Sequence, residues 1–152
     1  MRDNLPIMAQ PQPQELTQER IQRGVSEVAR PDGRILAVYL FGSRTKGEEH
    51  PRSDVDLAVL FDEPQTLSEL VDLEIRFEDA LGTEVDLVDL GKARPFLALD
   101  AIRGERLYCR DSTRCDEFDL YVLRRAGDLL PFERERRRIL LDPERYRTAA
   151  ES

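Results

Sequence analysis

The chain has 152 residues, with 23 Lys and Arg against 31 Asp and Glu and therefore a formal net charge of −8. Its 40% hydrophobic and 36% charged residues suit one domain with an ordinary core. The acidic balance argues against broad electrostatic binding to nucleic acid, and no apolar run approaches the roughly 20 residues of a membrane helix. We therefore expect a cytosolic (cytoplasmic) protein with no direct nucleic-acid or membrane partner.

Nitrogen and sulfur ligands for a metal ion are scarce in this chain. It has one histidine, His50, and two cysteines, Cys109 and Cys115, which form no CxxC motif. These residues are too few for a zinc site. Any metal ion would therefore have to be held by oxygen atoms.

Residues 1–14 end in alternating glutamine and proline and contain no apolar signal core, a composition that predicts a flexible N-terminal arm. From residue 16 to residue 29 the apolar spacing favours a helix, and the Pro-Asp-Gly sequence that follows would stop it. The next run, Ile35–Phe41, is continuously apolar and is bounded by Gly33 and Gly42. Such a run is typical of a strand buried on both faces of a sheet.

Two further strands and one well-marked helix follow. Residues 42–52 are polar and indicate a loop, and residues 54–61 predict a second strand. The helix begins after Thr66, which stands with Glu69 at capping-box spacing, and Gly82 ends it. Its apolar face repeats at steps of three or four residues: Leu67, Leu70, Leu73, Phe77 and Leu81. Residues 84–90 then predict a third strand.

The C-terminal part predicts a helix over 95–102, a short strand over 106–109 and a final helical region. That region begins at Asp111 or Ser112 and breaks at Pro131. Beyond the break the chain is locally basic, with arginines at 134, 136, 137 and 138. The alternation of helices and strands favours an α/β (α+β) fold, a mixed or parallel sheet covered by helices. We expect this domain to span residues 15–142 and a tail to follow at 143–152.

A pair of carboxylates stands on the predicted second strand. Asp54 and Asp56 are two residues apart, so the period of a strand turns both side chains to one face with their roots about 7 Å apart. Converging carboxylates repel each other, and a hard divalent cation such as Mg²⁺ relieves that repulsion. The alternative is a strand whose exposed face is simply acidic.

A glycine-serine turn precedes this pair. Gly42 follows directly on the buried strand and has no side chain to keep an anion from the backbone, and Ser43 offers a hydroxyl. A short helix starting at Ser43 would add free N–H groups suited to the phosphates of a nucleoside triphosphate. Arg44, Lys46 and Arg52 add positive charge, although each is also explained as a solvated loop cation. The turn and the acidic pair together are more specific than either alone.

In-line phosphoryl chemistry with two metal ions about 3.5 to 4 Å apart needs a third carboxylate. Asp86 lies between apolar residues in the middle of the predicted third strand, where an unpaired carboxylate is costly to bury. Asp89 lies nearer the end of that strand and on its opposite face, so we interpret it as a solvated or capping residue. The sequence leaves open which of the two is the third ligand.

Together these residues resemble a known family. Gly42-Ser43, ten intervening residues, Asp54-x-Asp56 and then Val85-Asp86-Leu87 match the signature of the DNA-polymerase-β-like nucleotidyltransferase superfamily. The short chain and the run over 85–90 most resemble the minimal nucleotidyltransferases, the antitoxin halves of HEPN/MNT toxin–antitoxin pairs. The resemblance implies a nucleotidyltransferase core with a mixed β-sheet flanked by helices.

The same resemblance implies an activity. A member of this family is an adenylyltransferase that binds ATP and Mg²⁺, transfers AMP to a hydroxyl, a tyrosine in this family, of a HEPN ribonuclease toxin, and acts as its antitoxin in a hetero-oligomer. The triphosphate would be held at Gly42 and Ser43, with Arg44 and Lys46 beside it. Two Mg²⁺ ions would be ligated by the carboxylates Asp54 and Asp56, and Asp86 would complete the ligand set of the catalytic metal ion and help to deprotonate the attacking hydroxyl.

Two alternatives stay open. The chain could neutralise its partner by binding alone, without catalysis, or it could transfer a nucleotide to a small molecule such as an aminoglycoside. Larger enzymes of the second kind bring a further domain for the acceptor, and we expect no such domain within 152 residues. The acceptor residue, the number of AMP units and the nucleotide preference do not follow from the sequence.

Overall fold

The structure is a computed structural model, and it describes residues 16–42 and 55–141. The predicted arm over 1–14 and the predicted tail over 143–152 lie outside the described residues. The elements, in chain order, are α2 (Gln18–Ala29), β1 (Ile35–Phe41), β2 (Val55–Phe61), α3 (Leu67–Leu81), β3 (Val85–Asp89), α4 (Pro95–Arg103), β4 (Glu105–Cys109) and α5 (Ser112–Leu141).

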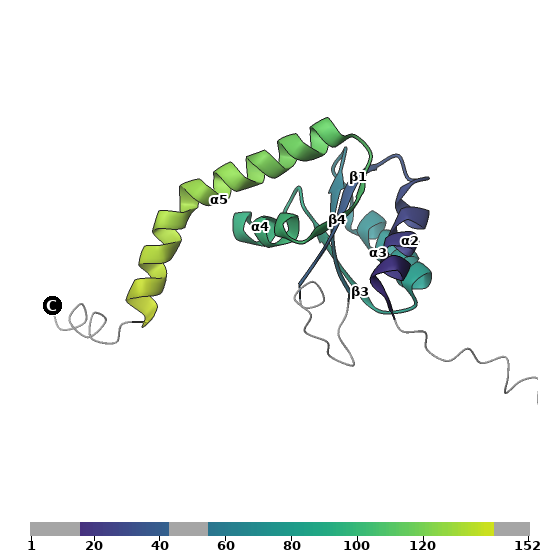
Figure 1. Ribbon diagram of the computed structural model, residues 1–152, viewed down its shortest axis with the longest axis horizontal. Helices are drawn as coiled ribbons and strands as arrows, with labels where there is room; N and C mark the ends of the chain where they lie inside the picture. Colours follow the sequence, from purple (N-terminus) through teal and green to yellow (C-terminus); the bar gives the residue numbers. More distant parts are fainter. Residues whose placement is uncertain (1–15, 43–54, 142–152) are drawn as a thin grey trace, which may run out of the picture.

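The four strands form one mixed sheet in the order β3-β2-β1-β4. The central strand β1 pairs antiparallel with both β2 and β4, whereas β2 pairs parallel with the edge strand β3. Figure 1 shows α2 and α3 on one side of this sheet, with α4 and α5 on the other. The prediction of a mixed sheet flanked by helices is therefore confirmed.

Each face of the sheet has its own hydrophobic core. Val38 and Leu57 pack with Val25 of α2 and Phe77 of α3 on the first face. On the second face the core includes Leu36, Tyr39 and Ala58 of the sheet, Ala98 and Ala101 of α4, and Val122 of α5. All seven residues of β1 are buried. Because β1 is central and covered on both sides, its apolar run is continuous rather than alternating, as the sequence predicted.

The ends of α3 match their sequence signals. The Thr66 hydroxyl accepts a hydrogen bond from the Glu69 N–H at 3.1 Å, which satisfies one of the free donors of the first turn. At the other end Gly82 has φ +71°, in the left-handed region, and its N–H donates to the Glu78 carbonyl at 2.8 Å. A residue with a side chain would be strained there, so glycine ends the helix.

The long helix α5 corrects one prediction. The break expected at Pro131 is wrong, because α5 runs continuously from Ser112 to Leu141 with this proline inside it. Figure 1 shows the helix changing direction past its midpoint. A proline in a helix removes one N–H donor and crowds the carbonyl four residues earlier, and a bend relieves that crowding without ending the helix. The expected cap is present, since Asp111 Oδ1 accepts from the Thr113 N–H at 3.1 Å.

The first turns of α5 are fixed to the sheet by polar contacts. The buried Tyr39 hydroxyl donates to Asp119 Oδ1 at 2.5 Å, and burial followed by this carboxylate raises the pKa of Tyr39. Arg106 of β4 also donates to Asp119, at 3.4 Å. A disulfide joins Cys109 at the end of β4 to the fully buried Cys115 of α5. The start of α5 is therefore part of the globular body.

Candidate active site

Three chain segments meet at one end of the sheet. β1 ends there at Phe41, and β2 and β3 both begin there. Phe41 is the register partner of Asp56, and Asp56 is in turn the register partner of Asp86 on the parallel strand β3. The Val55 N–H donates to the Glu84 carbonyl at 3.0 Å and fixes this alignment at the start of the two parallel strands. The sheet thus places Gly42, Asp56 and Asp86 side by side.

Gly42 has a conformation and a position that require glycine. Its φ is +84°, in the left-handed region. A Cβ atom on residue 42 would lie 3.1 Å from Cγ of Asp56 and closer still to its Oδ2 atom. The Oδ2 atom would be closer than real Cβ contacts allow, so the Asp56 carboxylate would have to shift. The backbone of the turn therefore lies directly against the Asp56 carboxylate.

The two described carboxylates point to the same face of the sheet. Asp56 precedes Ala58 by two residues, and Asp86 precedes Val88 by two residues, and both Ala58 and Val88 belong to the core beneath α4. Since side chains alternate along a strand, Asp56 and Asp86 share that face. Neighbouring strands lie about 4.8 Å apart, a distance at which two carboxylates can converge on one cation.

The structure changes the argument for Asp86. We expected it to be mid-strand and costly to bury, and that expectation is wrong: Asp86 is the second residue of the edge strand β3 and is exposed. We include Asp86 in the candidate site because it is the register partner of Asp56 on the parallel strand. Asp89 is opposite Val59, three positions further along, and its Oδ1 atom accepts from the Gly91 N–H at 3.0 Å. Asp89 therefore caps the turn after β3, the interpretation that the sequence favoured.

Several predicted site residues cannot be placed. Asp54, Ser43, Arg44 and Lys46 lie outside the described residues, as do His50 and Arg52. Within residues 16–42 and 55–141, no group of three or more histidine, cysteine or acidic side chains is arranged to hold a metal ion. The described part of the chain thus contributes two carboxylates and one glycine of the predicted set.

Two glutamates of α3 near β3 were missed from the sequence. Glu78 Oε2 accepts a hydrogen bond from the Val85 N–H at 3.1 Å, directly before Asp86. Burial raises the pKa of Glu74, and the charges of Glu78 and Asp86 raise it further. The start of β3 is therefore held by a side chain of α3, in a region of negative potential. No local pattern links Glu78 to Val85, so only the folded arrangement shows this contact.

The comparisons with known proteins agree with this geometry. The family model described as polymerase beta nucleotidyltransferase matches residues 24–113, which span α2 to the start of α5. The chain belongs to this family, and it is an enzyme of the nucleotidyltransferase class.

The individual relatives within this family include protein adenylyltransferases. The chain is 31% identical over 112 residues to the protein adenylyltransferase MntA of Shewanella oneidensis, a match that covers 72% of this chain and 76% of the relative. It is also 38% identical over 69 residues to the protein adenylyltransferase MntA of Thermococcus cleftensis, covering 45% of this chain and 70% of that protein.

Solved structures show the same fold. A toxin–antitoxin complex with AMP-PNP contains a chain that superposes with a TM-score of 0.70 at 23% identity, covering 80% of this chain and 98% of the other. A complex of the tri-AMPylated Shewanella oneidensis HEPN toxin with its MNT antitoxin gives a TM-score of 0.68 at 20% identity, covering 83% and 100%. At these identities the likeness shows the fold.

Proposed function

We propose that this chain is an antitoxin that transfers AMP from ATP to a tyrosine hydroxyl of a partner HEPN ribonuclease toxin, with Mg²⁺ as cofactor. The observation that carries the proposal is the convergence of Gly42, Asp56 and Asp86 at one end of the sheet. The likeness to a protein adenylyltransferase over 72% of the chain supports the choice of AMP and of a protein acceptor.

The donor set fits a hard divalent cation. Asp56 and Asp86 are carboxylates on adjacent strands and on one face, and Asp54 precedes Asp56 by two residues. Oxygen ligands of this kind suit Mg²⁺. We assign Asp54, Asp56 and Asp86 as the ligands of two Mg²⁺ ions. Bound there, Mg²⁺ would neutralise the negative charge of the triphosphate and of the transition state.

The turn after β1 is the part of the site that would bind the phosphates of ATP. With no side chain at residue 42, the triphosphate can approach the backbone beside Asp56. We assign the Ser43 hydroxyl, Arg44 and Lys46 to the phosphates. Held in this way, the α-phosphorus lies next to the carboxylates rather than in bulk water, so positioning and charge compensation provide most of the catalysis.

The transfer step balances without any further reactant. The tyrosine oxygen forms a bond to the α-phosphorus of ATP, and the bond from that phosphorus to the bridging oxygen of the β-phosphate breaks. Pyrophosphate leaves with that oxygen, and the phenol proton passes to the Asp86 carboxylate, which is exposed and therefore open to an acceptor. The products are the AMP-tyrosine ester and pyrophosphate.

The partner and the compartment belong to the same proposal. The related structures contain an MNT antitoxin together with a HEPN toxin, and we infer that this chain forms a hetero-oligomer with such a toxin in the cytoplasm. No helix in the described part of the chain is long and apolar enough to cross a membrane. The net charge of −8 gives no support to direct nucleic-acid binding.

Labelled AMP transfer tests the proposal. The purified chain is incubated with ATP labelled at the α-phosphate, Mg²⁺ and the HEPN protein encoded beside it, and modified residues are located by mass spectrometry. We expect AMP on a toxin tyrosine, and a loss of at least a hundredfold in rate with Asp56→Asn or Asp86→Asn. Asp89→Asn is the matched control, because it removes a carboxylate of the same strand that only caps a turn.

The outcomes separate the alternatives. A folded, ATP-binding chain that transfers no AMP to the toxin contradicts the proposal. If such a chain still neutralises the toxin, and Asp56→Asn does so equally well, the chain acts by binding alone. Transfer of label to a small molecule in place of the toxin would assign the enzyme to that substrate class.

A further inference from the structure

The distal part of α5 leaves the body of the protein with apolar side chains exposed. Ala126 is its last buried residue among those described. Beyond it, Leu129 and Leu130 are each 37% exposed and Phe132 is 74% exposed. Figure 1 shows this part of the helix projecting from the globular domain on the side of α4. Exposed apolar residues on a projecting helix are typical of a surface that another protein covers.

A groove of about 390 Å³ lies between α4 and α5. Its apolar wall includes Phe96 and Leu99 of α4 and Leu123 and Leu130 of α5. The α5 residues that line it extend from Leu123 to Arg137, which corresponds to about 21 Å along the helix axis. A groove between two helices, of this length, accepts about four turns of a third helix packed by ridges into grooves.

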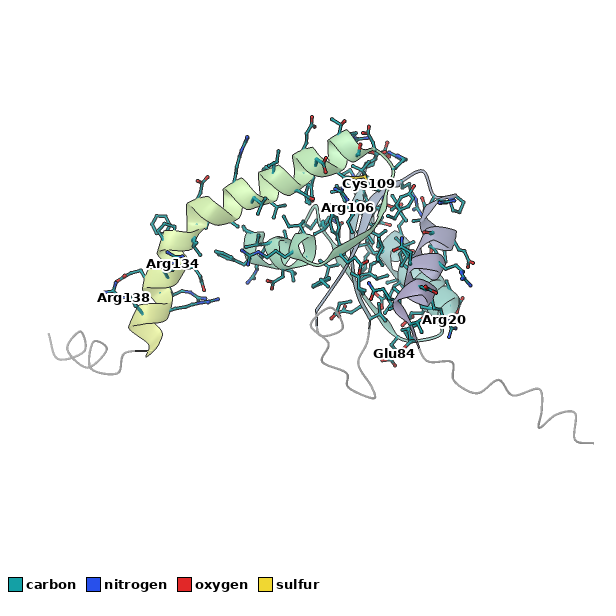
Figure 2. The ribbon with its side chains drawn as sticks, viewed as in Figure 1. Arg20, Glu84, Arg106, Cys109, Arg134 and Arg138 are labelled. Carbon is teal, nitrogen blue, oxygen red and sulfur yellow. A yellow bond between two sulfur atoms is a disulfide. The ribbon has the colours of Figure 1, made fainter. Side chains whose placement is uncertain are left out.

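The charged residues that line this groove are three arginines, Arg103, Arg134 and Arg137, and two carboxylates, Asp100 and Glu133, so the rim is net basic in an acidic protein. Arg103 of α4 and Arg134 of α5 both line it, and within the described part of the chain neither side chain makes a hydrogen bond or an ion pair. The rim residue Glu133 accepts hydrogen bonds from Arg136 at 2.9 Å and from Arg137 at 3.2 Å, so its charge is already compensated. Figure 2 shows Arg134 and Arg138 on the distal part of α5, remote from the sheet.

The charge distribution along this part of the chain is also basic. Between residues 124 and 138 the chain has six arginines and three carboxylates, whereas its total net charge is −8. Basic residues placed around an apolar groove complement acidic residues placed around an apolar stripe. The long apolar wall favours a protein helix over RNA, whose binding depends mainly on phosphate contacts and on stacking.

We propose that the α4–α5 groove, with Leu123 and Leu130 on its wall and Arg103 and Arg134 on its rim, binds an acidic amphipathic helix of the protein partner. The proposal rests on the proposed function only for the identity of that partner. The groove lies on the α4 side of the sheet, the side to which Asp56 and Asp86 also point.

Binding of the full chain to the separately purified HEPN protein encoded beside it, measured by calorimetry at two salt concentrations, tests this surface. We expect Leu130→Glu to weaken binding by at least tenfold. The matched control is Leu129→Glu, because Leu129 has the same exposure and is adjacent on the same helix, but does not line the groove. The double variant Arg103→Glu/Arg134→Glu should weaken binding by about tenfold at low salt and less at high salt.

A second control separates charge from position. Arg124→Glu makes one Arg-to-Glu charge reversal on α5 outside the groove, the same change as Arg134→Glu alone, and we expect an affinity within about twofold of wild type. Circular dichroism of each variant shows whether α5 is still helical. Equal affinities for Leu130→Glu and Leu129→Glu, with both variants helical, would overturn the proposal, as would a wild-type chain that does not bind the HEPN protein.

Failure of this proposal and failure of the proposed function look different. If groove variants lose binding while wild type binds but transfers no AMP, the groove proposal stands and the activity is wrong. If the groove variants bind the HEPN protein and transfer AMP as wild type does, the activity stands and the groove proposal is wrong.

Two further measurements test other occupants of the groove. Sedimentation of the chain alone identifies a second copy as the occupant if Leu130→Glu abolishes a dimer, and gel shifts identify RNA. Either result overturns the partner-helix proposal.

Discussion

Gly42 and Asp56 lie so close together that a Cβ atom on residue 42 would be 3.1 Å from Cγ of Asp56 and nearer still to Oδ2. The contact joins the residue that follows β1 to the second residue of β2, and Asp56 is aligned with Asp86 across the parallel pair. The glycine that we propose for the phosphate-binding turn therefore also limits where the proposed metal ligand Asp56 can lie. One residue couples the two halves of the site.

Gly42→Ala should reduce AMP transfer by at least tenfold, because the new methyl group displaces the Asp56 carboxylate or the turn. The positive φ of +84° adds strain of about 1 kcal/mol. Initial rates of AMP transfer and chemical unfolding measure the two effects.

Gly82→Ala is the control for Gly42→Ala. Gly82 also has a positive φ, +71°, but a Cβ atom on residue 82 would contact only the end of the Arg20 side chain, at 3.2 Å. The Gly82→Ala variant should lose about as much unfolding free energy as the strain costs Gly42→Ala, and it should transfer AMP at the wild-type rate. Equal rates for wild type and Gly42→Ala would contradict the coupling.

Glu78 should act as a positioning residue for Asp86. Its carboxylate accepts the Val85 N–H at 3.1 Å, so Glu78→Ala leaves that donor without its partner and loosens the start of β3. We expect a loss of about 1 to 2 kcal/mol in unfolding free energy and a several-fold lower kcat with little change in the KM for ATP.

Glu78→Gln keeps an acceptor oxygen at the same place and should restore most of the lost rate. A variant Glu78→Ala with normal kcat would show that the contact is structural only. If Glu78→Gln fails to restore the rate although it is stable, the charge of Glu78 rather than its hydrogen bond is what the site needs.

Local signals in the sequence predicted much of the fold. The uninterrupted apolar run over 35–41 predicted a strand covered on both sides, and β1 is central and fully buried. Thr66 and Gly82 predicted both ends of α3, since their effects depend on a few neighbouring residues. The break at Pro131 was wrong because a proline's effect on a helix depends on whether the helix can bend.

The site was less predictable because it depends on strand order and register. The sequence placed Asp86 in a buried strand, but the sheet places it on the edge strand, where it is exposed. Its alignment with Asp56 arises from the parallel pairing of β2 with β3, which no local pattern encodes. The same applies to Glu78 with Val85 and to the disulfide between Cys109 and Cys115, contacts made between different elements.

Reduction of the Cys109–Cys115 disulfide should lower the stability of the protein. The bond closes a short loop between β4 and α5, and loop-closure entropy for a separation of six residues gives about 2 kcal/mol. Chemical unfolding with and without dithiothreitol measures the difference, and thiol alkylation followed by mass spectrometry shows which form is present. In a reducing cytosol we expect the dithiol form.

The control for reduction is Cys109→Ala, which removes the disulfide while keeping the buried Cys115. Its stability should equal that of reduced wild type within about 0.5 kcal/mol and should not respond to dithiothreitol. A stability of wild type that is unaffected by dithiothreitol, although alkylation shows full reduction, would contradict the prediction.

Asp32 should make stability depend on pH in the acidic range. Its carboxylate is buried in the turn before β1, where Arg34 donates from Nη2 at 2.8 Å and from Nε at 2.9 Å, and Arg76 lies at 3.3 Å. The hydrogen bonds from the Arg34 side chain outweigh the opposing effect of burial and lower the pKa of Asp32 to about 2. Since the folded state binds this proton less tightly than the unfolded state, the stabilisation is complete above pH 4 and is lost as the pH falls toward 2. A difference of this size corresponds to about 2 kcal/mol.

The comparison of wild type with Asp32→Asn isolates this contribution. At pH 7 the unfolding free energy of the variant should be about 2 kcal/mol lower than that of wild type. This difference should shrink between pH 4 and pH 2, because Asp32 of wild type becomes protonated there. Asp79→Asn is the matched control, since Asp79 is an exposed residue of α3 without an ion pair in the described structure. Its stability should follow wild type at every pH. A wild-type advantage over Asp32→Asn that stays constant down to pH 2 would show that the Arg34 contact stabilises the turn through geometry rather than through charge.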